Sequence, residues 1–283
     1  MATKRQVTLR AQWIGKTFKE LRLRNGMTLQ EVGEYLGRDQ SSVSRFEAGI
    51  HPPRKDDVIA LMDLFGVEEE PQRQATLHMV DEVSKTGWWA KHTKDVDGWM
   101  IDWLWLEERS EELREFGVLA VPGLLQTPRY AESIIRADDP RAPKQQIKRW
   151  VDLRVNRQHT LRQKDFRISV VLDEAVLRRP AGDSSVMSEQ IKHLVASSQH
   201  ENVDIRVLPF SAGAHCGGAG AFRIILMPEP FPVVAHVDSP AGALFAEAAS
   251  AHELADRYDR LHQGSLDAEA SREFLRKVEQ ELR

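Results

Sequence analysis

The sequence has only one cysteine, Cys216, among its 283 residues, so it has no internal disulfide framework. A chain without disulfides is typical of a reducing compartment, and we expect a cytoplasmic protein. The sequence also lacks the run of about 18 apolar residues that a membrane-spanning helix requires, so no membrane association is expected. The polar, basic start MATKRQVTLRAQW lacks the apolar core of a secretory signal.

Motifs of common catalytic and cofactor sites are missing as well. The sequence contains no G-x-S-x-G elbow, no HExxH zinc motif and no P-loop. We interpret Asp173-Glu174 as the start of a helix, His215-Cys216 as loop residues without a metal, and the glycine cluster at 217–220 as a turn. We therefore expect a protein that is not an enzyme, with no catalytic residue, no metal and no cofactor.

The net charge of −4 is unevenly distributed along the chain. Residues 1–65 contain 11 Lys and Arg against 8 Asp and Glu, an excess of +3. The rest of the chain contains 28 against 35, which gives −7. The positive charge therefore lies at the N-terminus, where contact with nucleic-acid phosphates would need it.

Residues 1–67 predict a compact all-α domain of four short helices. Thr28 and Glu31 form a capping box at the start of the second helix. After a three-residue turn, Asp39 caps a third helix over residues 40–48. Two helices joined by so short a turn are typical of a helix-turn-helix domain.

The run MTLQEVGEYLGRDQSSVSRFEAG resembles the helix-turn-helix core of the phage-repressor (XRE) family. Gly33, Gly37 and Glu47-x-Gly49 stand where that family has a small residue, a turn glycine and Glu-x-Gly. The resemblance implies a structural clamp in which Arg22 of the first helix pairs with Glu47 of the third. It also implies binding to double-stranded DNA as a homodimer.

The third helix carries the side chains that we expect to contact DNA bases in the major groove. The expected base-reading residues are Gln40, Ser41, Ser42 and Arg45. The expected contacts to the DNA backbone come from Thr28, Gln30, Arg38 and Ser44. Many family members have a phosphate-binding glutamine at the second position of helix two, where this chain has Leu29.

Residues 68–98 predict a helical linker, and residues 99–283 predict a larger α+β domain. Five tryptophans lie between positions 88 and 105, and the helical spacing of Trp99 and Trp103 favours core packing over a ligand cage. Further along, strands are expected at 115–121, 166–172, VDIRVLPF, AFRIILM and PVVAHVD, and helices at 143–163, 187–199, 250–264 and 266–282. The alternation of Phe166, Ile168, Val170 and Leu172 predicts that the second of these strands is half-buried.

Three segments of this domain, VPGLLQT, VVLDEAVLRRP and VLPFSAGAHCG, resemble the C-terminal domain of XRE-like regulators of actinomycetes. Members of that group are described as antitoxin-like regulators, often linked to a small acidic protein encoded beside them. The resemblance implies a transcriptional regulator, nucleoid-associated when bound to DNA, whose C-terminal domain dimerises and senses such a partner.

Two alternatives remain open for the large domain. It could sense a small molecule in a pocket lined by VPGLLQT and His215. It could also be an enzyme that uses Asp173 and Glu174 as acid and base, although such a pair more often begins a helix.

Overall fold

The computed structural model describes residues 7–51, 53–85, 87–92, 95–239 and 242–282. The chain divides into two compact units, residues 1–103 with 229–231, and residues 104–228 with 232–283. No helix within the described residues is long and apolar enough to cross a membrane.

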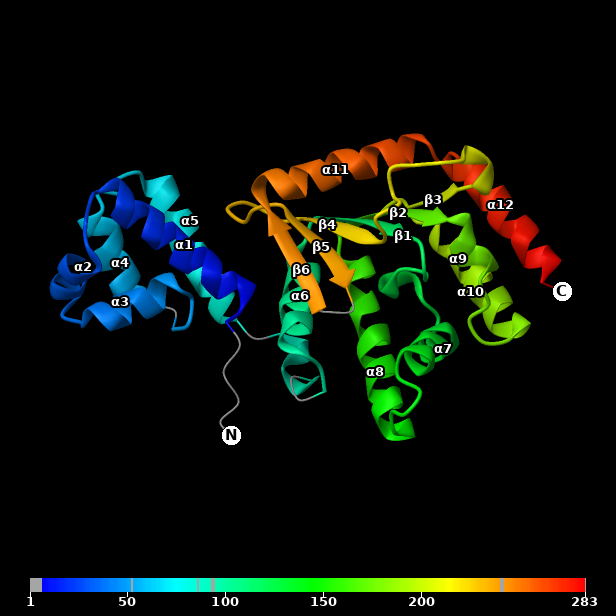
Figure 1. Ribbon diagram of the computed structural model, residues 1–283, viewed down its shortest axis with the longest axis horizontal. Coiled ribbons are helices and arrows are strands. Elements are labelled where there is room, and N and C mark those ends of the chain that lie inside the picture. The colour runs from blue at the N-terminus through cyan, green and yellow to red at the C-terminus, as the bar shows by residue number, and fades with distance from the viewer. Residues whose placement is uncertain (1–6, 52, 86, 93–94, 240–241, 283) are drawn as a thin grey trace. The chain divides into compact units, whose positions relative to one another are not determined.

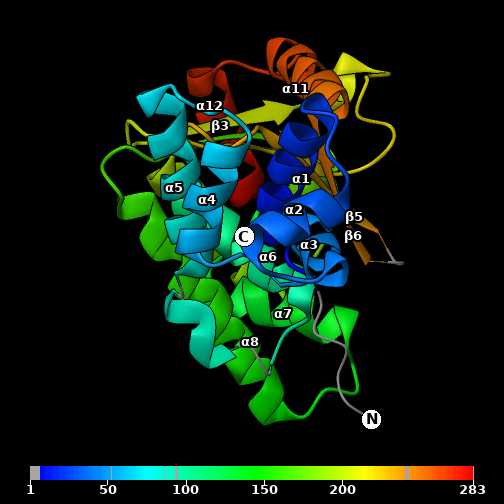
Figure 2. The ribbon, with the colours of Figure 1, turned by 90° about the vertical axis from the view of Figure 1, so that its left-hand side faces the viewer.

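The first unit contains a bundle of short helices (Figure 2). Its helices are α1 (Leu9–Arg24), α2 (Leu29–Leu36), α3 (Gln40–Glu47), α4 (Lys55–Leu64) and α5 (Glu70–Ser84). The capping box of Thr28 and Glu31 is confirmed, as is the Asp39 cap, whose carboxylate accepts the Ser42 N–H. Gly37 ends α2 at φ +63°, a conformation that glycine adopts without strain.

Helices α1 and α3 contact each other at the backbone. A Cβ atom on Gly15 of α1 would lie 2.4 Å from the carbonyl oxygen of Glu47 and 2.6 Å from that of Phe46. The helices enclose an apolar core that includes Ile14, Phe18, Val32, Val43 and Val58. The position of α3 is therefore fixed by close packing on its inner side.

Three of the five tryptophans that follow are buried; Trp103 is among them, whereas Trp99 is half-buried. Trp103 and Trp105 lie on α6 (Gly98–Arg109) and are 3% and 1% exposed. Trp89, in a short 3-10 turn over Trp88–His92, is 2% exposed.

The second unit is built on a six-stranded mixed sheet with the strand order β3-β2-β1-β4-β5-β6 (Figure 1). The strands are β1 (Glu112–Gly117), β2 (Arg167–Asp173), β3 (Val203–Leu208), β4 (Phe222–Leu226), β5 (Val234–Ser239) and β6 (Gly242–Glu247). Strands β1, β2 and β3 are parallel, and the other pairings are antiparallel.

Helices connect the parallel strands, as parallel pairing requires. Helices α7 (Pro128–Asp138) and α8 (Lys144–Arg157) lead from β1 to β2, and α9 (Glu174–Arg178) and α10 (Ser184–Ser197) lead from β2 to β3. The chain continues through α11 (Ala248–Gln263) and α12 (Ala268–Glu281).

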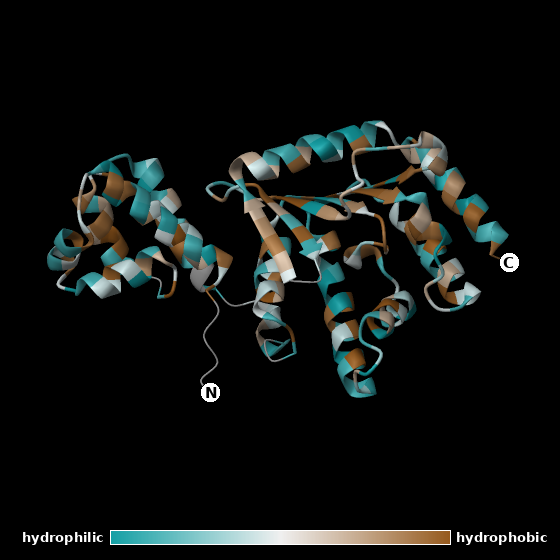
Figure 3. Ribbon diagram, in the orientation of Figure 1, coloured by the Kyte–Doolittle hydropathy of each residue, from teal (hydrophilic) through white to brown (hydrophobic). Residues whose placement is uncertain are grey.

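Helix α11 packs across one face of the sheet. Its Tyr258 and Leu261 share a buried cluster with Phe116, Val171 and Ile224 of the strands. The strands are accordingly hydrophobic in Figure 3, whereas α11 is largely hydrophilic on its outer side. The fold class is thus confirmed: an all-α N-terminal domain followed by a larger α+β domain.

Three expectations about individual elements were wrong. Strand β1 covers Glu112–Gly117 instead of 115–121, because the chain bends after Gly117 towards Pro122. Helix α8 ends at Arg157 and continues only as a 3-10 turn. Strand β2 is not half-buried, since it lies between two parallel neighbours and is covered on both faces, as is usual for parallel strands. Strand β6 was not expected at all.

Candidate nucleic-acid interface

Helix α3 has one apolar side and one polar side. Val43 and Phe46 are buried at 3% and 9% exposure. Of the four residues predicted to read bases, Gln40, Ser41 and Arg45 are exposed. The fourth, Ser42, is half-buried. The predicted phosphate contact Ser44 is also exposed. The structure therefore brings these side chains together on the outer side of one short helix.

The side chain of Arg45 extends along α3 towards the N-terminal half of the helix. Its Nη2 donates to Ser42 Oγ over 3.2 Å and lies 3.9 Å from the carboxylate of Asp39. A hydrogen bond from the Ser41 hydroxyl, together with the Ser42 N–H, holds the pKa of Asp39 below its usual range. Asp39 is therefore charged at neutral pH and helps to hold the Arg45 guanidinium beside the start of the helix.

Arg22 and Glu47 form the ion pair between the first and third helices. Arg22 Nε and Nη2 donate to the two carboxylate oxygens of Glu47 over 2.6 and 3.0 Å, and Nη1 donates to the Met27 carbonyl over 2.8 Å. Both side chains are about nine-tenths buried, at 10% and 9% exposure. The hydrogen bond to Glu47 raises the pKa of Arg22, so the pair stays charged.

The side chains predicted to contact the DNA backbone differ in whether they already have hydrogen-bond partners within the protein. Thr28 and Gln30 are exposed at the start of α2, where Thr28 caps the helix and Gln30 donates to Glu34. Arg38 instead donates three hydrogen bonds of 2.7–3.2 Å to the carboxylate of Asp57. A phosphate would have to compete with Asp57 for this guanidinium. The sequence did not reveal the pair, because it joins the turn between α2 and α3 to α4.

Tyr35 on α2 was missed by the sequence reasoning. Its side chain is 53% exposed. A tyrosine hydroxyl is a common donor to DNA phosphates. The available signal was its place on a short amphipathic helix, outside the set of Leu29, Val32 and Leu36 that gives the helix its buried side.

In the second unit, the VPGLLQT segment is built into the core. Leu124 and Leu125 are 1% and 0% exposed. Gln126 Nε2 donates to the Val121 carbonyl over 2.6 Å, and Gln190 of α10 bonds both the Leu125 carbonyl and the Thr127 N–H. These contacts explain the motif by packing and by backbone hydrogen bonding, and they leave little of it to line a ligand pocket.

Asp173 and Glu174 begin α9, as the sequence predicted. The Asp173 carboxylate accepts the Ala175 N–H over 2.8 Å and lies 3.5 Å from His215 Nε2. Glu174 accepts the Phe210 N–H over 2.8 Å and pairs with Arg178. Each carboxylate thus accepts a backbone N–H bond, that of Asp173 at the end of β2 and that of Glu174 just beyond the end of β3.

The sheet also carries a network of charges that is buried at Glu115 and half-exposed at Asp238. Arg223 pairs with Glu115 at 2.8 Å and with Asp238 at 2.5 Å, and its Nη1 lies 3.1 Å from His236 Nδ1. Burial and the adjacent Arg223 charge lower the pKa of His236 to about 4. Its side chain is 1% exposed and its ring lies 4.8 Å from that of Phe245. His236 is therefore neutral at pH 7.

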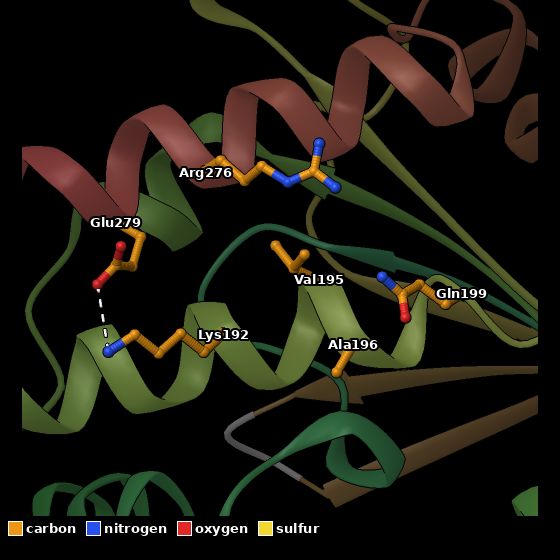
Figure 4. Close-up of a pocket in the computed structure, with 6 residues that line it drawn as sticks. All are labelled: Lys192, Val195, Ala196, Gln199, Arg276 and Glu279. Atoms are coloured by element: carbon orange, nitrogen blue, oxygen red, sulfur yellow. Dashed lines mark ion pairs between the residues drawn. The ribbon is translucent and has the colours of Figure 1, made fainter.

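A small pocket of about 200 Å³ lies between α10 and α12 (Figure 4). It is lined by Lys192, Val195, Ala196, Gln199, Arg276 and Glu279. Lys192 Nζ lies 3.4 Å from Glu279 Oε1, in a pair whose lysine is 59% exposed. Within the described part of the chain, no group of three or more His, Cys, Asp or Glu side chains is placed to hold a metal ion.

Two helices joined by a three-residue turn, with the second presenting an exposed polar side, define a helix-turn-helix DNA-binding domain, and the protein is a DNA-binding regulator of transcription. Residues 13–75 match the family of helix-turn-helix domains. Residues 101–277 match the domain of unknown function DUF5753, and this chain belongs to that family. No curated protein and no solved structure matches the chain.

Proposed function

We propose that the protein is a dimeric, sequence-specific transcription regulator of the XRE type. In this proposal Gln40, Ser41, Ser42 and Arg45 contact base edges in the major groove, and Thr28, Gln30, Arg38 and Ser44 contact phosphates. The supporting observation is the exposed polar side of α3, held in place by the Arg22–Glu47 pair. Two copies would read half-sites about 34 Å apart, one turn of the duplex.

We further propose that the DUF5753 domain acts by binding rather than by catalysis, as in antitoxin-like regulators of actinomycetes. It would hold the dimer together and sense a small acidic protein encoded nearby. Two observations favour this over an enzyme or a small-molecule sensor. Asp173 and Glu174 have structural partners, and VPGLLQT is buried.

The first test is a DNA footprint of the protein's own promoter with the Arg45→Ala variant. A bidentate arginine contact to guanine contributes about 1–3 kcal/mol, so we expect Arg45→Ala to weaken binding by that amount and to relax the preference at one base. Arg260→Ala is the matched control, because Arg260 is an exposed arginine on α11. An unchanged footprint for Arg45→Ala would exclude the base-reading role.

The same footprint, repeated with the purified product of the neighbouring gene, tests the sensing role. A bound partner should change the protected region or its affinity, because a ligand shifts a conformational equilibrium only by binding its states differently. Identical protection at saturating partner would exclude that role while leaving DNA binding intact.

A further inference from the structure

The two edges of the six-stranded sheet differ in how they are covered. At the β3 edge, the Leu266 N–H donates to the Val207 carbonyl over 2.9 Å, and the Val207 N–H donates to Ser271 Oγ over 3.0 Å. The chain leading into α12 therefore covers that edge. Strand β6 forms the other edge, and no strand among the described residues pairs with its outer side.

Strand β6 also lacks the features that usually protect an edge. Its sequence, Gly-Ala-Leu-Phe-Ala-Glu, contains no proline and no lysine, and its single charge, Glu247, stands at the end. Natural edge strands commonly carry such residues, or a bulge, to prevent pairing with another chain. Figure 3 shows β6 in hydrophobic to neutral colours along its length.

Leu244 is the most exposed apolar residue of this strand, at 61% exposure. It pairs in register with Val237 and lies on the same face as Ala246. Ala246 packs against the cluster under α11, whereas Leu244 lies two residues further from the start of that helix. The apolar face of the sheet thus extends to the open edge.

We propose that β6 pairs antiparallel with β6 of a second copy of this chain, about a two-fold axis at Leu244, so that two sheets become one. A two-fold axis perpendicular to an antiparallel pair places one residue opposite its own copy. With Leu244 at the axis, each Phe245 lies opposite Ala243 of the other copy, and each Ala246 lies opposite Gly242. The two Glu247 carboxylates stand at opposite ends, so no like charges meet.

The choice of a second copy of this chain as the partner of β6 rests on the proposed function, which requires two DNA-binding units. The strand is complementary to itself in hydrogen bonding, in apolar contact and in charge. The five residues of β6 that pair about Leu244, 242–246, bury less than the roughly 1,200 Å² of a standard stable interface, so we expect a dimer of micromolar affinity. Two linked half-sites on DNA would then strengthen it through effective concentration.

Sedimentation of the full chain tests the interface. We expect the wild type to dimerise at micromolar concentration and Leu244→Lys to weaken dimerisation at least tenfold, because it places two like charges at the axis. Leu119→Lys is the matched control, since Leu119 is 68% exposed in the loop after β1. A wild type that is monomeric at 100-fold higher concentration, or an equally tight Leu244→Lys dimer, would overturn the proposal.

Cross-linking tests the register independently of any loss of folding. Facing residues of an antiparallel pair have Cα atoms about 4.5–5.5 Å apart, within the range of a disulfide. In a Cys216→Ser background, Leu244→Cys should form a linked dimer on mild oxidation, and Leu119→Cys should not. Failure of Leu244→Cys to cross-link, or equal cross-linking by both variants, would overturn the pairing at Leu244.

The failure of this inference can be told apart from failure of the proposed function. Arg45→Ala should lose DNA affinity and keep the dimer, whereas Leu244→Lys should lose the dimer in the absence of DNA. A chain that dimerises through β6 without binding DNA leaves the inference standing and removes the proposed function. If the chain binds DNA but the Leu244→Lys variant dimerises as tightly as the wild type, the proposed function stands and the β6 interface is excluded.

Discussion

The Arg22–Glu47 pair shows how much one residue pair contributes to the presentation of α3. Both side chains are buried, and Arg22 also bonds the Met27 carbonyl in the turn before α2. The pair therefore joins α1, the turn and the end of α3. Its stabilising effect depends on both partners, because either charge alone would be buried without compensation.

We expect Arg22→Met to lower the free energy of unfolding of the helix-turn-helix domain by about 3–5 kcal/mol, because Glu47 would keep a buried charge. Native-state hydrogen exchange of the α1 and α3 amides measures this locally. The double variant Arg22→Met/Glu47→Leu should recover most of the loss. Lys55→Ala, which breaks an exposed pair with Asp81, should cost less than about 1 kcal/mol.

At the residue scale, the contacts that could be predicted from the sequence are those between residues close together in the chain. The Thr28–Glu31 box and the Asp39 cap join residues three apart, and the structure contains both. The Arg38–Asp57 pair was not predicted, because it depends on how α4 packs beside the turn. The DNA-contacting roles of the α3 side chains remain predictions until a footprint tests them.

At the scale of elements, strand β6 was missed for a physical reason. Its glycine and alanines have low strand propensity, and it is specified by pairing with β5 instead of by a period-two pattern. The boundary of β1 was misplaced for a related reason. Val118 and Leu119 are apolar and extend the pattern, but the chain has already left the sheet.

The junction between β6 and α11 turns sharply at Ala248, the one described non-glycine residue with a positive φ, at +51°. An L-residue pays a steric cost there that glycine avoids. We expect Ala248→Gly to raise the free energy of unfolding of the second unit by about 1 kcal/mol, as measured by urea denaturation.

The opposite sign is expected inside the same helix. Ala255→Gly, in the interior of α11, should lower the free energy of unfolding by about 1 kcal/mol, because glycine there has more backbone freedom to lose. Equal effects for the two variants would mean that Ala248 is not strained.

At the scale of the whole molecule, the buried charges of the sheet link stability to pH. His236 titrates near 6.5 in the unfolded chain, and burial lowers its pKa to about 4 in the folded one. Its contribution to stability is therefore fully present above pH 6.5 and is lost as the pH falls towards 4. Asp102 on α6, in the first unit, acts in the other direction, because burial raises its pKa to about 6. Its contribution to stability is present below its unfolded pKa of about 3.9 and is lost as the pH rises through 6.

We expect the free energy of unfolding of the second unit to fall by on the order of 3 kcal/mol between pH 6.5 and 4 because of His236. His236→Gln should flatten this part of the pH profile, measured by urea denaturation at several pH values. His200→Gln, which removes an exposed histidine, should leave the profile unchanged. A His236→Gln profile parallel to the wild type would contradict the assignment.

The contact between Gly15 and the end of α3 has a consequence for how DNA preference can change. The close approach of α1 to α3 depends on the missing side chain at Gly15 of α1, because a Cβ there would clash with the carbonyl oxygens of Phe46 and Glu47. Under the proposed function, the exposed side chains of α3 can therefore be substituted, and the operator preference changed, without disturbing the packing of α3 on α1. The contacts that hold α3 against α1, at Gly15 and through the Arg22–Glu47 pair, lie apart from the exposed side chains on the outer side of α3.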